Sequence, residues 1–193
     1  MDKTTRKWLD DVRAPDGELQ FAAYEHLMEA TEHPVEWAYE AWDELEEGLT
    51  HKDNHVRAIS AQLLNNLAKS DPEMRILGTL PALIEVTRDK RFVTARHCLQ
   101  SLWKVGLVGE EQRRYLLTVL ERRFADCAGE KNCKLIRYDI IVDLYQVFEA
   151  TGDAAVQEKA MALIATEEEE KYRKKYGGVW KRRKKGDQGA VDR

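Results

Sequence analysis

Proline and glycine are scarce in this chain of 193 residues, which contains only 4 Pro and 11 Gly. Runs of β-branched residues are also nearly absent. Because proline and glycine interrupt helices and β-branched runs favour strands, this composition favours helices over sheets. No apolar stretch approaches the ~20 residues needed to cross a bilayer, and the first residues contain no apolar signal region. The sequence therefore predicts an all-α protein with a cytoplasmic location and no membrane span.

Cysteine is rare as well, with Cys98, Cys127 and Cys133 as the three occurrences. An odd count without a C-x-x-C pair argues against a disulfide framework or a zinc knuckle. Cys98 falls inside a predicted helix and is expected to pack in the core. Cys127 and Cys133 flank a loop and could lie close in space. Reduced thiols are the expectation for all three.

Common catalytic motifs are absent. The sequence contains no G-x-S-x-G, no phosphate-binding G-x-x-x-x-G-K-S/T, no H-E-x-x-H and no G-x-G-x-x-G. His51 and His55 have the spacing of two metal ligands on a helix, but the predicted helix begins between them and no third ligand is evident. We therefore expect a non-enzymatic protein with no catalytic residue, metal or cofactor.

Charged residues, in contrast, are abundant at 34% of the chain, against about 25% in an average globular protein. Residues 171–193 hold ten Lys/Arg and two Asp/Glu, a net charge of +8. The remaining 21 Lys/Arg and 33 Asp/Glu give residues 1–170 a net charge of −12. The chain thus has an acidic body and a basic end, which bears on its partners rather than on its fold.

An amphipathic helical pattern recurs after 36 residues. Its first copy comprises Asp53, Val56, Ile59, Leu63 and Leu67, and its second copy comprises Asp89, Phe92, Ala95, Leu99 and Trp103. A period in this range is typical of stacked helix pairs, none of which can bury its apolar face alone.

These residues carry a resemblance to a known family. Asp53-x-x-Val56-Arg57 with the apolar helix that follows resembles the first helix of a HEAT repeat, and Leu80-Pro81-Ala82-Leu83-Ile84 followed by Asp89 resembles its second helix and linking Asp. The match is best over residues 34–105, but Val93 stands where a second basic residue would match Arg57. The resemblance to HEAT and armadillo-like proteins implies an α-α superhelix of about four repeats, usually used to hold another protein.

Apolar spacing predicts seven to nine helices joined by short loops, with helix caps at Asp16, at Asp53 or Asn54, and at Asp153 after a stop at Thr151-Gly152. We expect one HEAT-like domain over residues 1–176 and a basic, disordered tail over residues 177–193. Residues 72–88 predict a turn and then a new helix with Thr79 as its cap, or alternatively one kinked helix. The helix after Asp153 is expected to continue through acid–base pairs four residues apart, such as Glu167 with Lys171. The other helices are expected near residues 4–12, 16–30, 34–49, 53–69, 91–105, 110–126 and 133–149.

The helix predicted over residues 34–49 offers a candidate protein-binding surface. Its buried stripe is Val35, Ala38, Trp42, Leu45 and Leu49, and helical geometry places Trp37 and Tyr39 about 100° from the centre of that stripe. The aromatic pair could anchor a basic partner, with acidic neighbours adding long-range attraction. Packing of both aromatics against the next repeat is the alternative. The predicted site comprises Trp37, Tyr39, Glu40, Asp43 and Glu44.

The basic end offers a second candidate site, for anions or nucleic acid, at Lys181, Arg182, Arg183, Lys184 and Lys185. Tyr172, Tyr176 and Trp180 alternate with the basic residues, a pattern that suits phosphate contacts and base stacking. Contact with the acidic body, or plain disorder, is the alternative. Arg113, Arg114, Arg122 and Arg123 are expected to form a solvated basic helix face.

The main prediction is a protein-binding scaffold whose partner is a protein. A nucleic-acid-binding repeat protein is the second prediction. Because some HEAT-like proteins are DNA glycosylases that pair an aromatic with an acidic residue, that activity is the one enzymatic alternative. Trp103 with Asp139, or Trp42 with Asp43, would be its candidate pairs.

Overall fold

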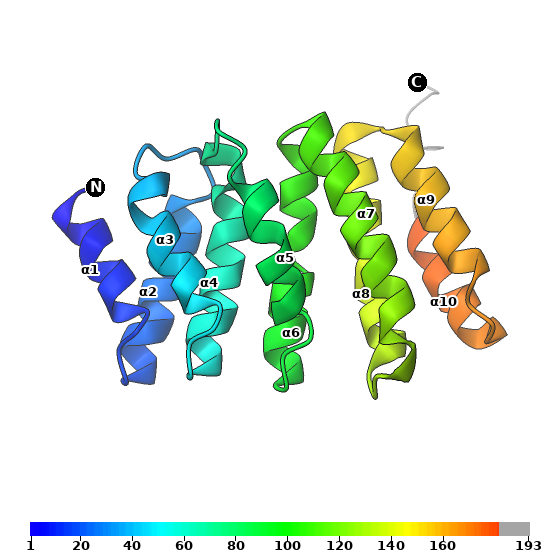
Figure 1. Cartoon of the computed structure of the whole chain (residues 1–193), viewed down its shortest axis with the longest axis horizontal. Coiled ribbons are helices and arrows are strands. Elements are labelled where there is room, and N and C mark those ends of the chain that lie inside the picture. The colour runs from blue at the N-terminus through cyan, green and yellow to red at the C-terminus, as the bar shows by residue number, and fades with distance from the viewer. Residues whose placement is uncertain (182–193) are drawn as a thin grey trace, which may run out of the picture. The chain divides into compact units, whose positions relative to one another are not determined.

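The computed structural model describes residues 1–181, and this part of the chain consists of helices joined by short loops (Figure 1). No strand occurs within residues 1–181, so the predicted all-helical class is confirmed. The ten α-helices in this range are α1 (Lys3–Asp11), α2 (Gly17–Ala30), α3 (Ala38–Gly48), α4 (Asn54–Leu67), α5 (Ile76–Val86), α6 (Phe92–Leu99), α7 (Glu110–Asp126), α8 (Cys133–Thr151), α9 (Ala154–Ala165) and α10 (Glu170–Lys181). Three short 3-10 helices are η1 (Ala68–Ser70), η2 (Leu102–Leu107) and η3 (Cys127–Gly129).

The chain divides into two compact units. The first comprises Met1–Leu116 and contains α1 to α6, and the second begins at Leu117 and contains α8 to α10. The boundary falls inside α7, within the range for which the sequence predicted a single repeat domain.

Helix α4 forms the centre of the first unit. It packs against α3, α5 and α6 and also contacts α2, while α1 packs against α2. Every residue over 58–67 is buried, because α4 is covered by helices from several sides. The core around it includes Leu27 of α2, Trp42 of α3, Leu83 of α5 and Leu99 of α6, each of them almost fully buried.

Side chains about one repeat length apart bond to each other in the first unit. The Asn65 amide donates to Ser101 Oγ over 2.8 Å, across 36 residues. The Asn66 amide donates to Thr31 Oγ1 over 3.0 Å, across 35 residues. Some side chains 35 or 36 residues apart in sequence are therefore neighbours in space within the first unit.

A buried ion pair joins the first turn of α4 to the α5–α6 loop in the first unit. Arg57 donates to both carboxylate oxygens of Asp89, at 2.5 and 3.0 Å, and the two side chains are 11% and 7% exposed. Arg57 also donates to the His51 carbonyl over 2.7 Å, and Asp89 accepts the Arg91 N–H over 2.8 Å. The pair thus ties the α3–α4 loop to the α5–α6 loop.

The predicted helix caps are present. Asp16, Asp53 and Asp153 each accept a hydrogen bond from a backbone N–H in the first turn of the following helix. Gly152 ends α8 with a φ of 68°, a left-handed conformation that favours glycine. The predicted stop and cap at residues 151–153 are therefore confirmed.

Two helix boundaries in the first unit differ from prediction. α3 begins at Ala38 rather than near residue 34, because residues 34–37 are not helical and the Val35 N–H donates to Ser70 Oγ over 2.9 Å. α5 is a single helix, so the predicted cap at Thr79 is wrong and the one-helix alternative holds. Pro81 lies inside α5 on its exposed side, where the carbonyl that lacks a backbone partner can reach water.

The helix predicted over residues 91–105 also ends early. α6 stops at Leu99, and the 3-10 helix η2 follows it. Ser101 Oγ donates toward the carbonyls of Cys98 (2.8 Å) and His97 (3.1 Å). A side chain that binds the preceding turn in this way competes with the continuing helix.

In the second unit, α8 packs against α9 and α10. The continuous helix predicted after Asp153 is wrong, because α9 ends at Ala165 and α10 begins at Glu170. Glu167 does not pair with Lys171 along a helix; its fully buried carboxylate accepts hydrogen bonds from Lys134 and Arg137 at 2.5 and 3.0 Å. The chain therefore turns back at residues 166–169 around a buried carboxylate.

The predicted start of the tail at residue 177 is also wrong. α10 continues through Gly177 and Gly178 to Lys181. Tyr176 is fully buried and donates from its hydroxyl to the Lys134 carbonyl over 2.9 Å, and Trp180 packs on Tyr145 and Phe148 of α8. Packing of these aromatics explains why the helix extends through two glycines.

Candidate protein-binding site

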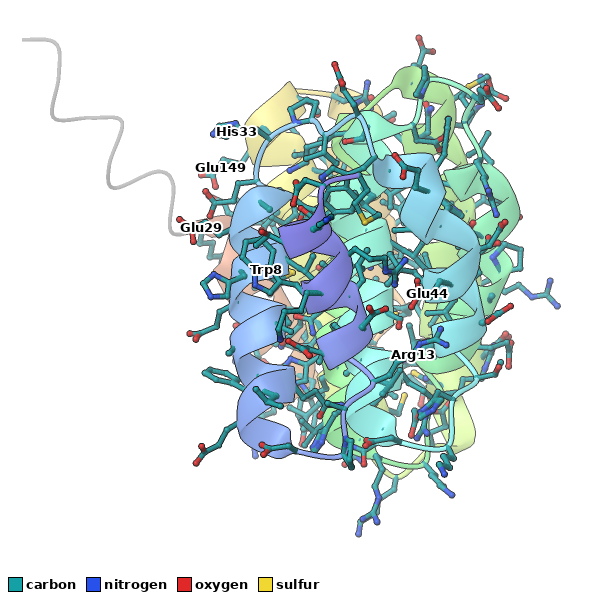
Figure 2. All side chains as sticks on the ribbon, turned by 90° about the vertical axis from the view of Figure 1, so that its left-hand side faces the viewer. Trp8, Arg13, Glu29, His33, Glu44 and Glu149 are labelled. Carbon is teal, nitrogen blue, oxygen red and sulfur yellow. The ribbon has the colours of Figure 1, made fainter. Side chains whose placement is uncertain are left out.

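The acidic residues predicted as a binding surface on α3 are engaged within the chain. Glu44 forms an ion pair with Arg6 of α1, with 2.6 Å between the guanidinium nitrogen and the carboxylate oxygen. Glu44 also lies beside Arg13 (Figure 2). Arg75 pairs with Asp43 and, at 3.0 Å, with Glu46. Their charges are compensated by arginines of the same unit, which weakens the predicted attraction for a basic partner.

Two of the other predicted site residues, Glu40 and Tyr39, also have hydrogen-bond partners within the chain. Glu40 binds the Met1 amino group over 2.6 Å. The Tyr39 hydroxyl donates to Asp71 over 2.6 Å and accepts the Glu73 N–H over 3.0 Å, and burial together with the Asp71 carboxylate raises its pKa. Trp37 is half-buried at the N-cap position of α3. Tyr39 therefore tethers the loop after η1, and the alternative of packing against the next repeat describes it better.

An open apolar groove runs between α2 and α4 of the same unit. Its hollow has a volume of about 320 Å³. Phe21 stands on one wall with 58% of its surface exposed, and the Tyr24 hydroxyl is fixed by a 3.1 Å hydrogen bond with Gln62. The groove is lined by Gly17, Gln20, Phe21, Tyr24, His55, Ala58, Ile59, Gln62 and His97.

A second hollow of about 670 Å³ continues the groove toward α6. It shares His55, Ala58 and His97 with the first and is further lined by Asn54, Lys90, Arg91, Phe92, Val93 and Thr94. We call the two together the α2/α4/α6 groove. Val93 is 67% exposed, so a large apolar side chain faces solvent at each end of this groove, Phe21 at one and Val93 at the other.

The end of the groove near α6 is cationic. Lys90 and Arg91 are exposed, and neither side chain makes an ion pair with any residue in the described range 1–181. Asp89, the acidic residue next to them in sequence, is already bound by Arg57. An acidic group of a ligand would therefore meet uncompensated positive charge here.

Sequence reasoning missed this groove. Leu19 of α2 precedes the buried Ala23 by four residues, as expected of a position on the buried side, but it is 47% exposed. The signal available in the sequence was Phe21, an aromatic residue on a different side of α2 from Ala23 and Leu27. One exposed aromatic residue does not identify a groove until the helix that packs beside it is known.

At the basic end, Lys181 is exposed at the last position of α10, while Arg182, Arg183, Lys184 and Lys185 lie outside the described residues. The interleaved aromatics do not form a stacking surface, because Tyr172 and Tyr176 pack together and Trp180 packs on α8. Arg123 is also not part of a solvated face. It is fully buried and holds Glu130 at 2.7 and 2.9 Å.

The candidate enzymatic pairs gain no support. Trp42 is fully buried with its indole N–H on Thr79, while Asp43 of the same helix is exposed and paired with Arg75. Trp103 belongs to the first unit and Asp139 to the second. The Nδ1 atom of His51 accepts a hydrogen bond from the Asp53 N–H, so His51 acts as a loop residue that binds the backbone. Within residues 1–181, no group of three or more His, Cys, Asp or Glu side chains could hold a metal ion.

Among the described helices, none combines the length and apolar character needed to cross a membrane. No family model matches this sequence, and no curated protein matches it.

Solved structures do resemble it. An engineered protein, Northeast Structural Genomics Consortium target OR329, superposes with a TM-score of 0.55 at 15% identity, covering 92% of this chain and 78% of its own. A second engineered protein, target OR366, gives a TM-score of 0.56 at 17% identity, with 93% and 79% covered. At these identities the likeness concerns the all-helical fold alone.

Proposed function

We propose that this chain is a non-enzymatic, HEAT-like protein-binding module that holds a segment of a partner protein in the α2/α4/α6 groove. The hydrogen bonds between positions 35 and 36 residues apart support the repeat character of the first unit. The observation that carries the proposed site is a pair of hollows with shared lining residues, along which the apolar side chains of Phe21 and Val93 are exposed. Exposed apolar surface of this kind typically marks a binding site.

The groove also defines the chemistry of its ligand. Its walls are apolar and aromatic near α2, and cationic near Lys90 and Arg91 of the α5–α6 loop. We therefore expect a peptide segment with two or three spaced apolar side chains and with Asp or Glu at one end. The apolar residues would displace water from the Phe21 wall, and the acidic end would pair with Lys90 and Arg91.

A selection from a random 16-residue peptide library tests this proposal. The full chain is immobilised, enriched peptides are synthesised with a fluorophore, and their dissociation constants are measured by fluorescence anisotropy. Phe21→Glu should weaken binding by at least about tenfold, because it places a charge against the apolar part of the ligand. Arg91→Glu should weaken the binding of peptides in proportion to the number of acidic residues that they contain.

Met161 supplies a matched control. It is an apolar side chain 40% exposed on α9, outside the groove, and Met161→Glu should leave every dissociation constant unchanged. Peptides that bind Phe21→Glu as tightly as the unaltered chain would contradict the proposal. A selection that enriches no peptide would contradict it as well.

Nucleic acid is a second candidate ligand, favoured by the exposed cations of α10. Lys171, Arg173, Lys174 and Lys175 lie at its surface, although Lys174 pairs with Glu170 at 2.6 Å. Binding of a single-stranded oligonucleotide to the full chain should then weaken steeply with salt, and Arg173→Glu with Lys175→Glu should reduce the salt slope. An oligonucleotide that shows no binding at low salt would eliminate this candidate.

A further inference from the structure

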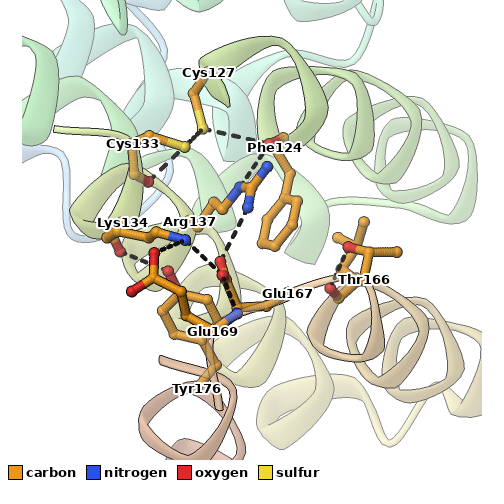
Figure 3. A network of polar contacts seen from close by, with 10 residues as sticks. Phe124, Cys127, Cys133, Lys134, Arg137, Thr166, Glu167, Glu169 and Tyr176 are labelled. Atoms are coloured by element: carbon orange, nitrogen blue, oxygen red, sulfur yellow. Dashed lines mark hydrogen bonds and ion pairs between the residues drawn. The ribbon is translucent and has the colours of Figure 1, made fainter. Parts of the chain in front are cut away.

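Two of the three cysteines form a close pair in the second unit. Cys127 lies in η3 and Cys133 is the first residue of α8, and their Sγ atoms are 2.7 Å apart (Figure 3). Cys127 is fully buried and Cys133 is 7% exposed. A disulfide bond, at about 2.05 Å, would require the two sulfur atoms to approach by only about 0.7 Å.

The loop between the two cysteines is held in place while both are thiols. The Glu130 N–H donates to the Cys127 carbonyl over 2.8 Å, and the Cys133 N–H donates to the Glu130 carbonyl over 3.1 Å. The buried guanidinium of Arg123 binds both carboxylate oxygens of Glu130. These bonds hold the backbone on both sides of the pair while the two sulfur atoms lie about 0.7 Å beyond bonding distance.

The two sulfur atoms differ in access. Cys133 lines an open hollow of about 420 Å³, together with Glu130, Lys131, Lys134, Arg137 and Glu167. Cys127 lies beneath it, with its Sγ atom 3.3 Å from the Phe124 carbonyl. Burial and the contact with Cys133 raise the pKa of the Cys127 thiol to about 12. A small oxidant would thus reach Cys133 first.

We propose that Cys127 and Cys133 are a redox modification site whose substrate is a peroxide of hydrogen-peroxide size, entering through this hollow. The Cys133 thiolate attacks one peroxide oxygen, the O–O bond breaks, and the hydroxide that leaves takes up a proton to become water. The product is a Cys133 sulfenic acid. The Cys127 sulfur then attacks the Cys133 sulfur, an S–S bond forms, the S–O bond breaks, and a second water leaves with the Cys127 proton. Two thiols are oxidised and one peroxide is reduced to two waters.

Cys98 is the internal comparison. It is buried in the first unit with its Sγ atom 3.2 Å from the Leu83 carbonyl, and no other cysteine belongs to that unit. Oxidation should therefore select the Cys127–Cys133 pair and leave Cys98 as a thiol. This inference is independent of the proposed peptide-binding function.

Mass spectrometry of the full chain after treatment with hydrogen peroxide tests the proposal. The protein is treated, its remaining thiols are alkylated after unfolding, and peptides are mapped. We expect a peptide joined through Cys127 and Cys133, an alkylated Cys98, and full recovery of both thiols with dithiothreitol. Cys127→Ser should instead accumulate a Cys133 sulfenic acid that reacts with dimedone, while Cys98→Ala should form the disulfide at the unaltered rate.

Two results would overturn the proposal. One is a pair that stays reduced in the folded chain and oxidises only in urea, at a rate that follows unfolding. The other is oxidation of Cys98 as fast as that of the pair. Because the unaltered chain supplies both readouts, the test does not depend on the folding of any variant.

Discussion

At the residue scale, a few buried polar atoms within residues 1–181 lack a hydrogen-bond partner, and Asp143 of α8 stands out among them because both of its carboxylate oxygens do. It is fully buried, and neither carboxylate oxygen has a hydrogen-bond partner among residues 1–181. Burial, together with the nearby Asp139 carboxylate, raises the pKa of Asp143 well above its ordinary value. The folded state therefore binds a proton at this site more tightly than the unfolded state does.

The sign of the resulting pH dependence follows from this raised pKa. The stabilising contribution of the proton is fully present below the unfolded pKa of Asp143 and is lost as the pH rises toward the folded pKa. Asp143→Asn removes the ionisable group and should raise the free energy of unfolding at pH 7 by about 1–3 kcal/mol. At pH 4 the gain should largely disappear. Urea unfolding at both pH values measures this, and an Asp143→Asn chain that is less stable than the unaltered one at pH 7 would refute it.

A second prediction at this scale concerns Arg57. Its buried bidentate pair with Asp89 cannot be broken cheaply, because an uncompensated carboxylate would remain. Arg57→Ala should lower the free energy of unfolding by about 3–5 kcal/mol. Arg57→Lys should recover only part of the loss, since an ammonium group cannot reproduce the two-pronged geometry.

Arg88→Ala is the control for Arg57. Arg88 pairs with the exposed Glu85 of α5 at 2.6 Å, and its removal should cost less than about 1 kcal/mol. Urea unfolding of the three variants in parallel makes the comparison. Equal losses for Arg57→Ala and Arg88→Ala would show that the buried pair has no special role.

At the element scale, sequence reasoning located helices better than it located their ends. The caps at Asp16, Asp53 and Asp153 act through the nearest backbone, so local sequence suffices to find them. The start of α3 depends on Ser70, and the separation of α9 from α10 depends on Lys134 and Arg137. Such partners lie 30 or more residues away in sequence, and no helical pattern reveals them.

The same limit applied to the candidate sites. Glu40, Asp43 and Glu44 stand on one helix face as predicted, but the groups that compensate them come from the Met1 amino group, α1 and the segment before α5. The α2/α4/α6 groove exists only where three helices meet. Its residues are spread over the range 17–97, so the helical pattern of any single segment could not indicate it.

A prediction at the element scale concerns the docking of α10. Glu167 accepts hydrogen bonds from Lys134, Arg137 and the Glu169 N–H, and their combined effect outweighs burial and lowers its pKa. Glu167→Gln should weaken these charge-assisted bonds and let α10 open more often. Hydrogen exchange of the α10 amides should then be at least about tenfold faster, as expected for a local opening that costs about 1.4 kcal/mol less.

Glu170→Gln is the matched control for this prediction. Glu170 is exposed and pairs only along α10, with Lys174, so exchange of the α10 amides should change little. Faster exchange spread evenly over α8, α9 and α10 in Glu167→Gln would mean general destabilisation rather than release of α10.

At the scale of the whole molecule, the charge of the chain and its candidate binding surface are separate features. The acidic excess of residues 1–170 is large in sequence, but on α3 its members are paired with Arg6, Arg13 and Arg75. Within residues 1–181, Lys90 and Arg91 at the end of the apolar groove make no such ion pair. Recognition by this module is therefore expected to depend on apolar contacts, with charge setting the orientation of the ligand.

The five histidines of the chain allow the most direct measurement of where a partner binds. His55 and His97 line the groove, whereas His26 stacks on Trp8 of α1 and His33 and His51 lie outside the groove. A peptide obtained by selection is titrated into the full chain while the imidazole proton resonances are followed by NMR. The proposal predicts saturable shifts of His55 and His97, with the other three histidines unmoved. Shifts confined to His26, His33 or His51 would contradict the assignment of the α2/α4/α6 groove as the binding site.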